Sequence, residues 1–247
     1  VKDYEEAEII VVNTCTVTSK AEQKARRMIR LFSARGKVVI ATGCYAEVNR
    51  EEVESLGDNI VIFSLGEKAS ILTLPEHIER MVLAGMDTLD AVKSFKKSER
   101  SVFSFDAHSF SYHSRAYLKI QDGCDNSCGY CRTTIARGKS VFLEPEIVVE
   151  RVKKLEEEGF HEIMLTGVNL TNYDHDGEGL GGVMEKILSV VGPDIRLRLS
   201  SMEPDHVDAR LLDAIAHNRV LPHSHIPITS ASAHVLTLPG RKHPIRH

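Results

Sequence analysis

The first part of the chain alternates short apolar runs with amphipathic segments. Three apolar runs have the length of buried strands, and they cover residues 8–13, 37–42 and 60–63. Between the first two runs, residues 19–35 repeat apolar side chains at helical spacing. This strand, helix, strand order predicts a small parallel α/β unit. Residues 68–92 are also predicted to be helical, with an interruption near Pro75 because proline lacks the amide hydrogen that a helix interior uses.

A polar stretch separates this unit from a second series of strand and helix signals. Residues 93–115 begin with a run rich in lysine and serine, which predicts a linker between domains. Beyond the linker we expect strands at residues 117–120, 162–165, 195–199 and 225–228, and helices at residues 146–158, 183–191 and 205–216. Asp205 is predicted to cap the last of these helices.

Together these patterns predict an α/β protein with two domains. Residues 1–92 are predicted to form a small N-terminal parallel α/β domain. Residues 116–247 carry repeated strand–helix units, which are typical of a β/α barrel. Because only four strands are predicted there, we expect a partial barrel, truncated at its C-terminal end. The chain has no initiator methionine, so we also expect the start of the first domain to be missing.

Composition and charge narrow the class of protein. The chain has 31 Lys and Arg against 35 Asp and Glu, and its net charge of −4 excludes a generally basic nucleic-acid binder. No apolar stretch approaches the ~20 residues of a membrane helix, and because the first residues are acidic and polar we expect no signal peptide. The 5 cysteines are odd in number and clustered, which favours a metal in a reducing cytoplasm over a disulfide framework.

Three of the cysteines lie close together in the sequence. Cys124, Cys128 and Cys131 can close on one soft metal centre, but a structural zinc site uses four ligands. Three thiolates on a cubane cluster leave one iron open, where S-adenosylmethionine (SAM) can chelate and be cleaved reductively to a 5′-deoxyadenosyl radical. The alternatives are a zinc knuckle or buried cysteines. The preceding Gly123, the aromatic Tyr130 and the position after a predicted strand favour the cluster.

At this point the sequence resembles a known family. A CxxxCxxC motif with an aromatic residue before its third cysteine resembles the radical SAM signature. Further segments resemble motifs of the radical SAM methylthiotransferases, namely residues 13–17 (NTCTV), 42–46 (TGCYA), 136–138 (ARG), 165–169 (LTGVN) with Tyr173, and 198–204 (RLSSMEP). The sequence Thr-Gly-Val-Asn at residues 166–169 favours the branch of the family that modifies threonylcarbamoyladenosine in tRNA.

The resemblance implies a fold, a reaction and partners. It implies a radical SAM barrel, two [4Fe–4S] clusters and two uses of SAM. The radical removes hydrogen from C2 of an adenine beside the anticodon, and a methylthio group replaces it. The implied partners are the anticodon stem–loop of tRNA and a flavodoxin- or ferredoxin-like electron donor. We expect a cytoplasmic monomer without a membrane segment.

The resemblance also assigns residues to the two cofactors. Cys15 and Cys44 would ligate the second cluster, and its third cysteine is expected upstream of Val1. The alternative is that both are buried cysteines at strand ends. The residues implied for SAM are Tyr130, Thr166, Gly167, Asn169, Ser200 and Glu203. For Gly167 the alternative is a turn glycine, and for Glu203 a charge at a helix start.

A basic segment is the candidate RNA contact. Residues 23–46 contain no Asp or Glu but include Lys24, Arg26, Arg27, Arg30, Arg35 and Lys37. Such a face can bind stem phosphates, and we expect Arg26 and Arg27 to contribute. The alternative is a solvated helix face.

Some positions depart from the family pattern. Residues 132–134 (RTT) stand where two apolar residues and a proline are usual, residues 228–232 replace a Gln-Ser-Gly-Ser run, and Pro239 replaces a common methionine. Alternative functions are methylthiolation of isopentenyladenosine or of a ribosomal-protein aspartate, and an inactive metal-binding fragment. A dinucleotide-binding protein is disfavoured because no G-x-G-x-x-G follows a strand.

Overall fold

The structure is a computed structural model that describes residues 4–99, 101–104, 114–126, 128–129, 131–227 and 232. The chain divides into two compact units, Val1–Phe105 and Asp106–His247. Within the residues described, no helix has both the length and the apolar character needed to cross a membrane. The predicted linker over residues 93–115 includes residues 105–113, which lie outside the described residues, so its limits stay a prediction.

The first unit is built on a parallel sheet. Its strands are β1 (Ile9–Thr14), β2 (Val38–Gly43) and β3 (Ile60–Ile62), in the order β1-β2-β3. Helix α1 (Ser19–Ala34) connects the first two strands and begins after Thr18, whose hydroxyl accepts a hydrogen bond from the amide of Ala21. The strand–helix–strand unit predicted from the sequence is confirmed.

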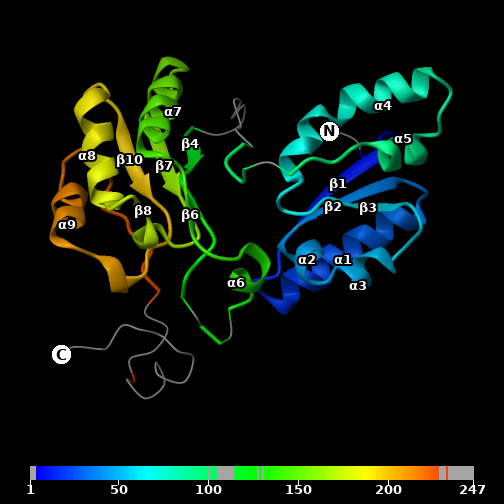
Figure 1. The fold of residues 1–247 in the computed structure, drawn as a ribbon, viewed down its shortest axis with the longest axis horizontal. Coiled ribbons are helices and arrows are strands. Elements are labelled where there is room, and N and C mark those ends of the chain that lie inside the picture. The colour runs from blue at the N-terminus through cyan, green and yellow to red at the C-terminus, as the bar shows by residue number, and fades with distance from the viewer. Residues whose placement is uncertain are drawn as a thin grey trace. The chain divides into compact units, whose positions relative to one another are not determined.

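Helices cover both faces of this sheet. They are α1, α2 (Cys44–Val48), α3 (Arg50–Glu54), α4 (Leu74–Leu83) and α5 (Thr88–Ser94), with a 3₁₀ turn η1 (Lys68–Thr73) before α4. Figure 1 shows α1, α2 and α3 on one face and α4 and α5 on the other. On β2, Val39 and Ala41 belong to the core on the α1 side, whereas Val38 and Ile40 belong to the core beside α4 and α5. This alternation is the two-residue period of a strand.

The predicted interruption at Pro75 is only partly right. Pro75 lies in the first turn of α4, where a missing amide hydrogen costs nothing because that amide has no partner within the helix. The break between helices falls after α4 instead, at Gly85, which has a φ of 87°. A left-handed residue ends a helix readily when it is glycine.

The second unit also contains a parallel sheet. Its strands are β4 (Ala116–Lys119), β7 (Glu162–Thr166) and β10 (Arg196–Leu199), in the order β10-β7-β4. Helix α7 (Pro145–Glu157) precedes β7, and helix α8 (Leu180–Val190) precedes β10. The α/β fold class is therefore confirmed, with a parallel N-terminal unit followed by repeated strand–helix units.

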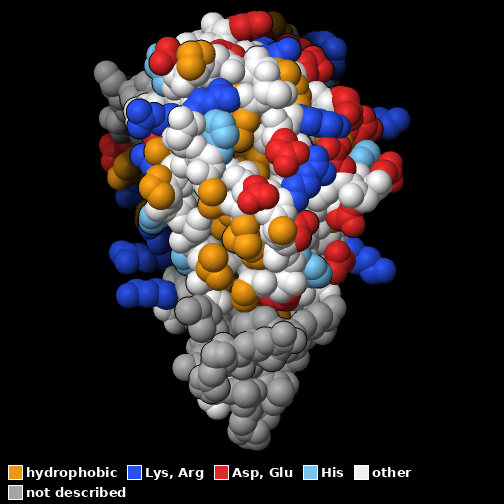
Figure 2. Space-filling model, turned by 90° about the vertical axis from the view of Figure 1, so that its left-hand side faces the viewer, with side chains coloured by type: hydrophobic (Ala, Val, Ile, Leu, Met, Phe, Trp, Pro, Cys, Tyr) orange, Lys and Arg blue, Asp and Glu red, His pale blue; other side chains and the backbone are white. Residues whose placement is uncertain are grey.

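The second unit also contains several shorter elements. They are the antiparallel pair β5 (Gln121–Asp122) and β6 (Val141–Phe142), helix α6 (Arg132–Arg137), the pair β8 (Asp174–His175) and β9 (Glu178–Gly179), the 3₁₀ turns η2 (Leu170–Asn172) and η3 (Pro204–His206), and helix α9 (Ala209–Ile215). On the face seen in Figure 2, basic and acidic side chains are interspersed. Two ion pairs link these elements, since Lys186 of α8 pairs with Glu178 of β9 and Arg210 of α9 pairs with Glu185 of α8.

Two details of the second unit differ from the sequence prediction. Asp208, not Asp205, caps the last helix, because Asp205 lies in η3 and the Asp208 carboxylate accepts the amide hydrogen of Leu211 at 2.7 Å. The strand predicted at residues 225–228 is not continuous in its described part. Parallel bridges join Leu197 to Val220 and Ser201 to His225 instead. Residue 228 lies outside the described residues.

Candidate functional site

The cysteine loop lies between β5 and α6, just beyond the carboxyl end of β4. Cys124 is buried, and Cys128 and Cys131 are half-buried. Gly123 has a φ of 71°, and a Cβ there would lie 2.0 Å from the carbonyl oxygen of Lys139. The amide of Cys124 donates to the carbonyl of Gly138 at 3.1 Å. The base of the loop is thus closed by a backbone contact that needs glycine at position 123.

A buried ion pair ties the two ends of this loop together. Asp122 is 4% exposed, and its carboxylate lies 2.7 Å from Nη1 of Arg137 and 2.9 Å from Nζ of Lys119. Burial works to raise the pKa of Asp122, but Lys119 and Arg137 outweigh it and lower the pKa. Because Asp122 ends β5 and Arg137 ends α6, the pair joins the segments on either side of the cysteines.

The thiols of the loop differ in their electrostatics. Burial raises the pKa of Cys124, although the amide of Asn126 donates to its sulfur at 3.4 Å. Burial also works to raise the pKa of Cys131, but hydrogen bonds from Thr133 and Thr134 outweigh it and lower the pKa. The departure from the family pattern at residues 132–134 therefore brings hydrogen-bond donors to Cys131, which favour the thiolate form that ligates metals.

The donor set suits an iron–sulfur cluster. Within the described ranges, no three His, Cys, Asp or Glu side chains are grouped as ligands of one metal ion. Thiolates of a zinc site all lie about 2.3 Å from a single ion, whereas the cysteines of a cubane cluster bind separate iron atoms and stand further apart. The fit to a cluster rests on the three thiols and their environment, and not on a preformed ligand geometry.

Gln121 links the cysteine loop to the end of the neighbouring strand. Its side chain is completely buried, donates to the carbonyl oxygens of Asp122 (3.1 Å) and Gly123 (2.7 Å), and accepts the amide hydrogen of Asn169 at 2.9 Å. A Cβ on Gly167 would lie 2.7 Å from Oε1 of Gln121, so the absence of a side chain at residue 167 makes room for this link.

The predicted SAM residues lie in one polar network at the ends of β7 and β10. The amide of Gly167 donates to Oγ of Ser200 at 3.1 Å, and Oδ1 of Asn169 accepts the amide hydrogen of Glu203 at 3.2 Å. Thr166 ends β7, and its carbonyl accepts the amide hydrogen of Ile120 at 3.0 Å. Tyr130 lies outside the described residues. The structure brings the other five predicted residues together, and their binding role stays a prediction.

Sequence reasoning missed three polar residues of this network besides Asp122. Gln121 is one, and Thr171 and Asn172 are the others. The hydroxyl of Thr171 donates to Oδ1 of Asn169 at 2.7 Å, and the amide nitrogen of Asn172 lies 3.9 Å from the sulfur of Cys124. For Gln121 the available signal was its position directly after a predicted strand, since polar side chains at strand carboxyl ends form the sites of barrel proteins. Thr171 and Asn172 lie further along the chain, in η2, and gave no such signal.

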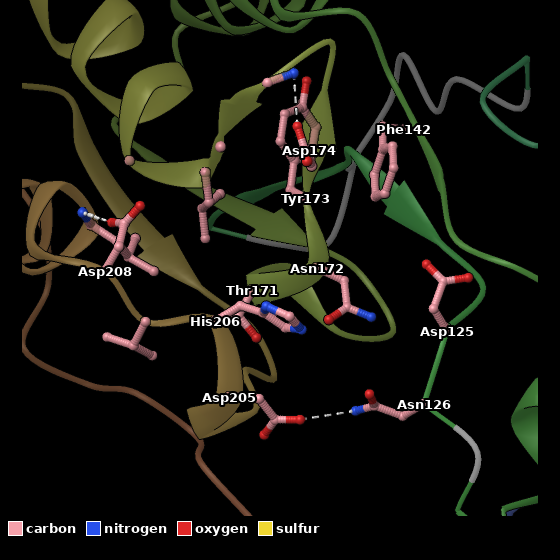
Figure 3. Close-up of a pocket in the computed structure, with 16 residues that line it drawn as sticks. Asp125, Asn126, Phe142, Thr171, Asn172, Tyr173, Asp174, Asp205, His206 and Asp208 are labelled. Carbon is pink, nitrogen blue, oxygen red and sulfur yellow. Dashed lines mark hydrogen bonds between the residues drawn. The ribbon is translucent and has the colours of Figure 1, made fainter. Parts of the chain in front are cut away.

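A pocket of about 660 Å³ lies beside the cysteine loop. Figure 3 shows Asp125 and Asn126 of the loop at one side of it and Asp208 at the other, with Asn172 and Tyr173 between them, and a hydrogen bond joins Asn126 to Asp205. The hydroxyl of Tyr173 donates to the carbonyl of Leu143, and burial raises the pKa of this tyrosine, which keeps it protonated. The pocket combines an aromatic wall with amide and carboxylate groups.

The other two cysteines follow adjacent strands of the first unit. Cys15 follows β1 and is exposed, whereas Cys44 follows β2 and is buried. Thr14 is in register with Gly43, so both cysteines emerge at the same end of the sheet. A Cβ on Gly43 would lie 2.3 Å from the carbonyl oxygen of Thr14, so this close approach requires glycine. The placement agrees with the expected edge, while the ligand role stays a prediction.

Comparison with known proteins places the chain in a family. A family model described as the Radical SAM superfamily matches residues 118–247, and one described as Uncharacterized protein family UPF0004 matches residues 1–64. The chain belongs to the radical SAM superfamily. More particularly, it is similar to proteins named threonylcarbamoyladenosine tRNA methylthiotransferase MtaB. The resemblance to methylthiotransferases inferred from the motifs is confirmed.

The similarity to these relatives extends over most of this chain. The MtaB of Thermotoga maritima is 36% identical over 95% of this chain and 53% of that protein, and the MtaB of Treponema pallidum is 34% identical over 92% and 58%. The chain spans about half the length of the curated relatives it matches.

Solved structures agree at the level of fold. The radical SAM methyltransferase TsrM of Kitasatospora setae has a TM-score of 0.62 at 16% identity, and covers 96% of this chain with 53% of its own. The cobalamin-dependent radical SAM enzyme OxsB has a TM-score of 0.55 at 12% identity, with coverages of 96% and 37%.

Proposed function

We propose that this chain carries the radical SAM centre of a tRNA methylthiotransferase. The observation that carries the proposal is the cysteine loop at the end of β4, joined through Gln121 to Asn169 and the polar network beyond it. The link supports the proposal because it connects the cysteine loop to residues that the family resemblance implies for SAM, and Cys124 itself lies 3.9 Å from the side-chain amide of Asn172. The motif match along the chain and the names of its relatives support the same reaction.

In this proposal Cys124, Cys128 and Cys131 hold a [4Fe–4S] cluster. When bound, the cluster supplies the electron that cleaves SAM to methionine and a 5′-deoxyadenosyl radical. Gln121 and the Asp122 ion pair keep the loop closed. The Asn172 amide donates to the sulfur of Cys124, which stabilises negative charge there.

The remaining predicted residues take supporting roles in the proposal. Asn169, Ser200 and Glu203 offer polar groups to SAM, with Thr166 and Gly167 at the strand end between them. Cys15 and Cys44 ligate a second cluster, together with a cysteine expected upstream. An external flavodoxin- or ferredoxin-like protein donates electrons.

We propose threonylcarbamoyladenosine beside the anticodon as the nucleoside modified. The Thr-Gly-Val-Asn motif at residues 166–169 and the names of the relatives favour it over isopentenyladenosine or a ribosomal-protein aspartate. Mass spectrometry of tRNA and ribosomal protein from cells with and without the gene distinguishes the three. A methylthio group missing from the nucleoside is expected, and loss from the protein aspartate alone would contradict the assignment.

The cysteine triad is tested by replacing Cys128 with alanine. After anaerobic reconstitution with iron and sulfide, we expect the wild-type chain to form 5′-deoxyadenosine from SAM and dithionite, and Cys128→Ala to form none. Loss of one of three thiolates removes a cluster ligand. The 5′-deoxyadenosine that forms is measured by chromatography, and the loss of the cluster is measured by counting bound iron.

The matched control is Cys15→Ala, which removes an exposed cysteine from the first unit and leaves the triad intact. It should still cleave SAM. Cleavage that survives Cys128→Ala would contradict the assignment. Bound zinc and no 5′-deoxyadenosine from the wild-type chain would support a non-catalytic metal-binding module instead.

A further inference from the structure

The outer face of α1 carries a hollow of about 620 Å³. It is lined by Gln23, Arg26, Arg27, Arg30 and Leu31, and is called here the arginine hollow. The opposite face of the helix carries Ala25, Ile29 and Phe32, which are buried in the core. Core packing therefore fixes the helix so that its arginines point away from the sheet, and three guanidinium groups share one small surface.

The three arginines are not equivalent. Nη1 of Arg26 lies 2.9 Å from Oε1 of Glu52 and 3.5 Å from the hydroxyl of Tyr45, and its guanidinium carbon is 5.7 Å from the centre of the tyrosine ring. Arg27 and Arg30 are exposed and form no ion pair with any residue that the structure describes. The charge available to a ligand thus comes from Arg27, one of the two arginines named from the sequence, and from Arg30, whereas Arg26, the other one named, is paired with Glu52.

Glu52 is paired with Arg26, which lines the arginine hollow. The hydrogen bond that it accepts from Tyr45 lowers the pKa of Glu52, and the hydrogen bond from Arg26 and the charges of Arg26 and Arg30 lower it further. Glu52 therefore stays ionised at neutral pH and neutralises Arg26. Tyr45 directly follows Cys44, so the contacts among Arg26, Glu52 and Tyr45 lie next to a proposed ligand of the second iron–sulfur cluster.

We propose that the arginine hollow binds backbone phosphates of RNA, with Arg27 and Arg30 as the contacts and Glu52 limiting the contribution of Arg26. This rests on the proposed function, in which the substrate is tRNA. Guanidinium groups match phosphate oxygens in geometry as well as charge. The net charge of −4 makes a local basic site necessary for RNA binding. The names of the relatives favour RNA over an acidic protein as the occupant.

The first test neutralises the two exposed arginines. The probe is a fluorescein-labelled anticodon stem–loop RNA, and the readout is its Kd for the whole chain over a range of KCl concentrations. For Arg27→Gln/Arg30→Gln we expect Kd to rise roughly tenfold at low salt, and the slope of log Kd against log[KCl] to fall by about 1.5. The matched control is Lys20→Gln/Lys153→Gln, which removes the same charge from exposed positions outside both the hollow and the basic segment of residues 23–46.

The second test releases Arg26. Glu52→Gln should tighten RNA binding by roughly threefold or more and increase the salt slope by about 1, because one more cation becomes available. Its control is Glu54→Gln on the same helix, where the carboxylate pairs with Arg50 at 3.1 Å. Both variants remove one negative charge, so only a contact effect separates them. Circular dichroism verifies that every variant is folded.

Each outcome decides the proposal. If the arginine variant binds RNA as well as the lysine control does, or if Glu52→Gln behaves like Glu54→Gln, the hollow is not an RNA site. Loss of binding to reduced flavodoxin with unchanged RNA binding would overturn it in favour of an acidic protein partner. A wild-type chain that binds no RNA also overturns it. Formation of 5′-deoxyadenosine is measured without RNA, so failure here leaves the proposed radical chemistry separately testable.

Discussion

Replacing Gly123 with alanine should open the cysteine loop at its base. The new methyl group would lie 2.0 Å from the carbonyl oxygen and 2.6 Å from the carbonyl carbon of Lys139, and backbone atoms cannot yield as a flexible side chain can. The φ of 71° adds strain for any residue with a Cβ. Together we expect a cost of roughly 2–5 kcal/mol, localised in the loop.

The accessibility of Cys124 measures this opening. Cys124 is 8% exposed, so alkylation by iodoacetamide requires the loop to open. Each 1.4 kcal/mol lost raises the open population about tenfold, so a cost of roughly 2–5 kcal/mol should accelerate labelling of Cys124 in the metal-free chain by roughly 30-fold to 4000-fold. Cys44 is 7% exposed in the other unit and serves as an internal reference in the same peptide mass spectra.

Two other glycines provide graded controls. Gly138 has a φ of 72° but open space around its Cβ position, so Gly138→Ala should cost only the conformational strain of about 1–2 kcal/mol. Gly129 lies in the same loop with open space and no left-handed φ, so Gly129→Ala should change little. Equal labelling rates in all three variants would show that the contact with Lys139 does not close the loop.

Replacing Asp122 with asparagine should weaken the same loop by a different route. The variant leaves Arg137 and Lys119 without the carboxylate that they share, and removing one partner of a largely buried pair is costly. Because the basic side chains are about one-third exposed, at 36% and 30%, we expect roughly 2–3 kcal/mol, less than for a fully buried pair. Labelling of Cys124 again reports the loss.

The ion pair also predicts a pH dependence with a definite sign. The folded-state pKa of Asp122 lies below its ordinary value of 3.8, so its contribution is present above that value and is lost as the pH falls through the folded-state pKa. At low pH the opening of the loop is measured by hydrogen exchange of its backbone amides. In the wild-type chain, the protection of these amides against exchange should decline below about pH 4. Asp122→Asn should lack that decline.

Asp125→Asn is the matched control for the ion pair. Asp125 is exposed in the same loop, and its carboxylate accepts one amide hydrogen bond from Ser140 at 3.2 Å. We expect less than about 1 kcal/mol from this change. Arg137→Lys should give an intermediate loss, because it keeps the charge but not the guanidinium that lies within 3.0 Å of both carboxylate oxygens. An Asp122 variant no weaker than the Asp125 control would refute the role of the pair.

These two contacts explain why the segment around the cysteines is not an independent motif. Gly123 and Asp122 precede the first cysteine, and their partners Lys139 and Arg137 follow the last one. These contacts therefore hold the two ends of the cysteine loop together without a bound cluster. We expect reconstitution with iron and sulfide to be less efficient in both variants for this reason.

The order of strands and helices was determined by the sequence itself. β2 is a short continuous apolar run that is buried throughout, and apolar side chains recur at helical spacing in α1, so both patterns can be read along the chain without knowledge of distant contacts. The spacing of the three cysteines and the motif wording were likewise readable along the chain. The sequence does not distinguish two aspartates that can each cap a helix. In the structure Asp205 lies within the turn η3, and Asp208 after it caps α9.

The tertiary structure alone decided which distant residues meet. Asp122 pairs with Arg137, Gln121 reaches Asn169, and Glu52 holds Arg26, although nothing in the spacing of these residues predicts the contacts. A buried polar side chain forms its hydrogen bonds with the groups that the packing of strands and helices brings near, and these groups can be distant in sequence. The sequence thus determined the elements and the candidate chemistry, whereas packing decided how the loop is closed and which arginines remain available.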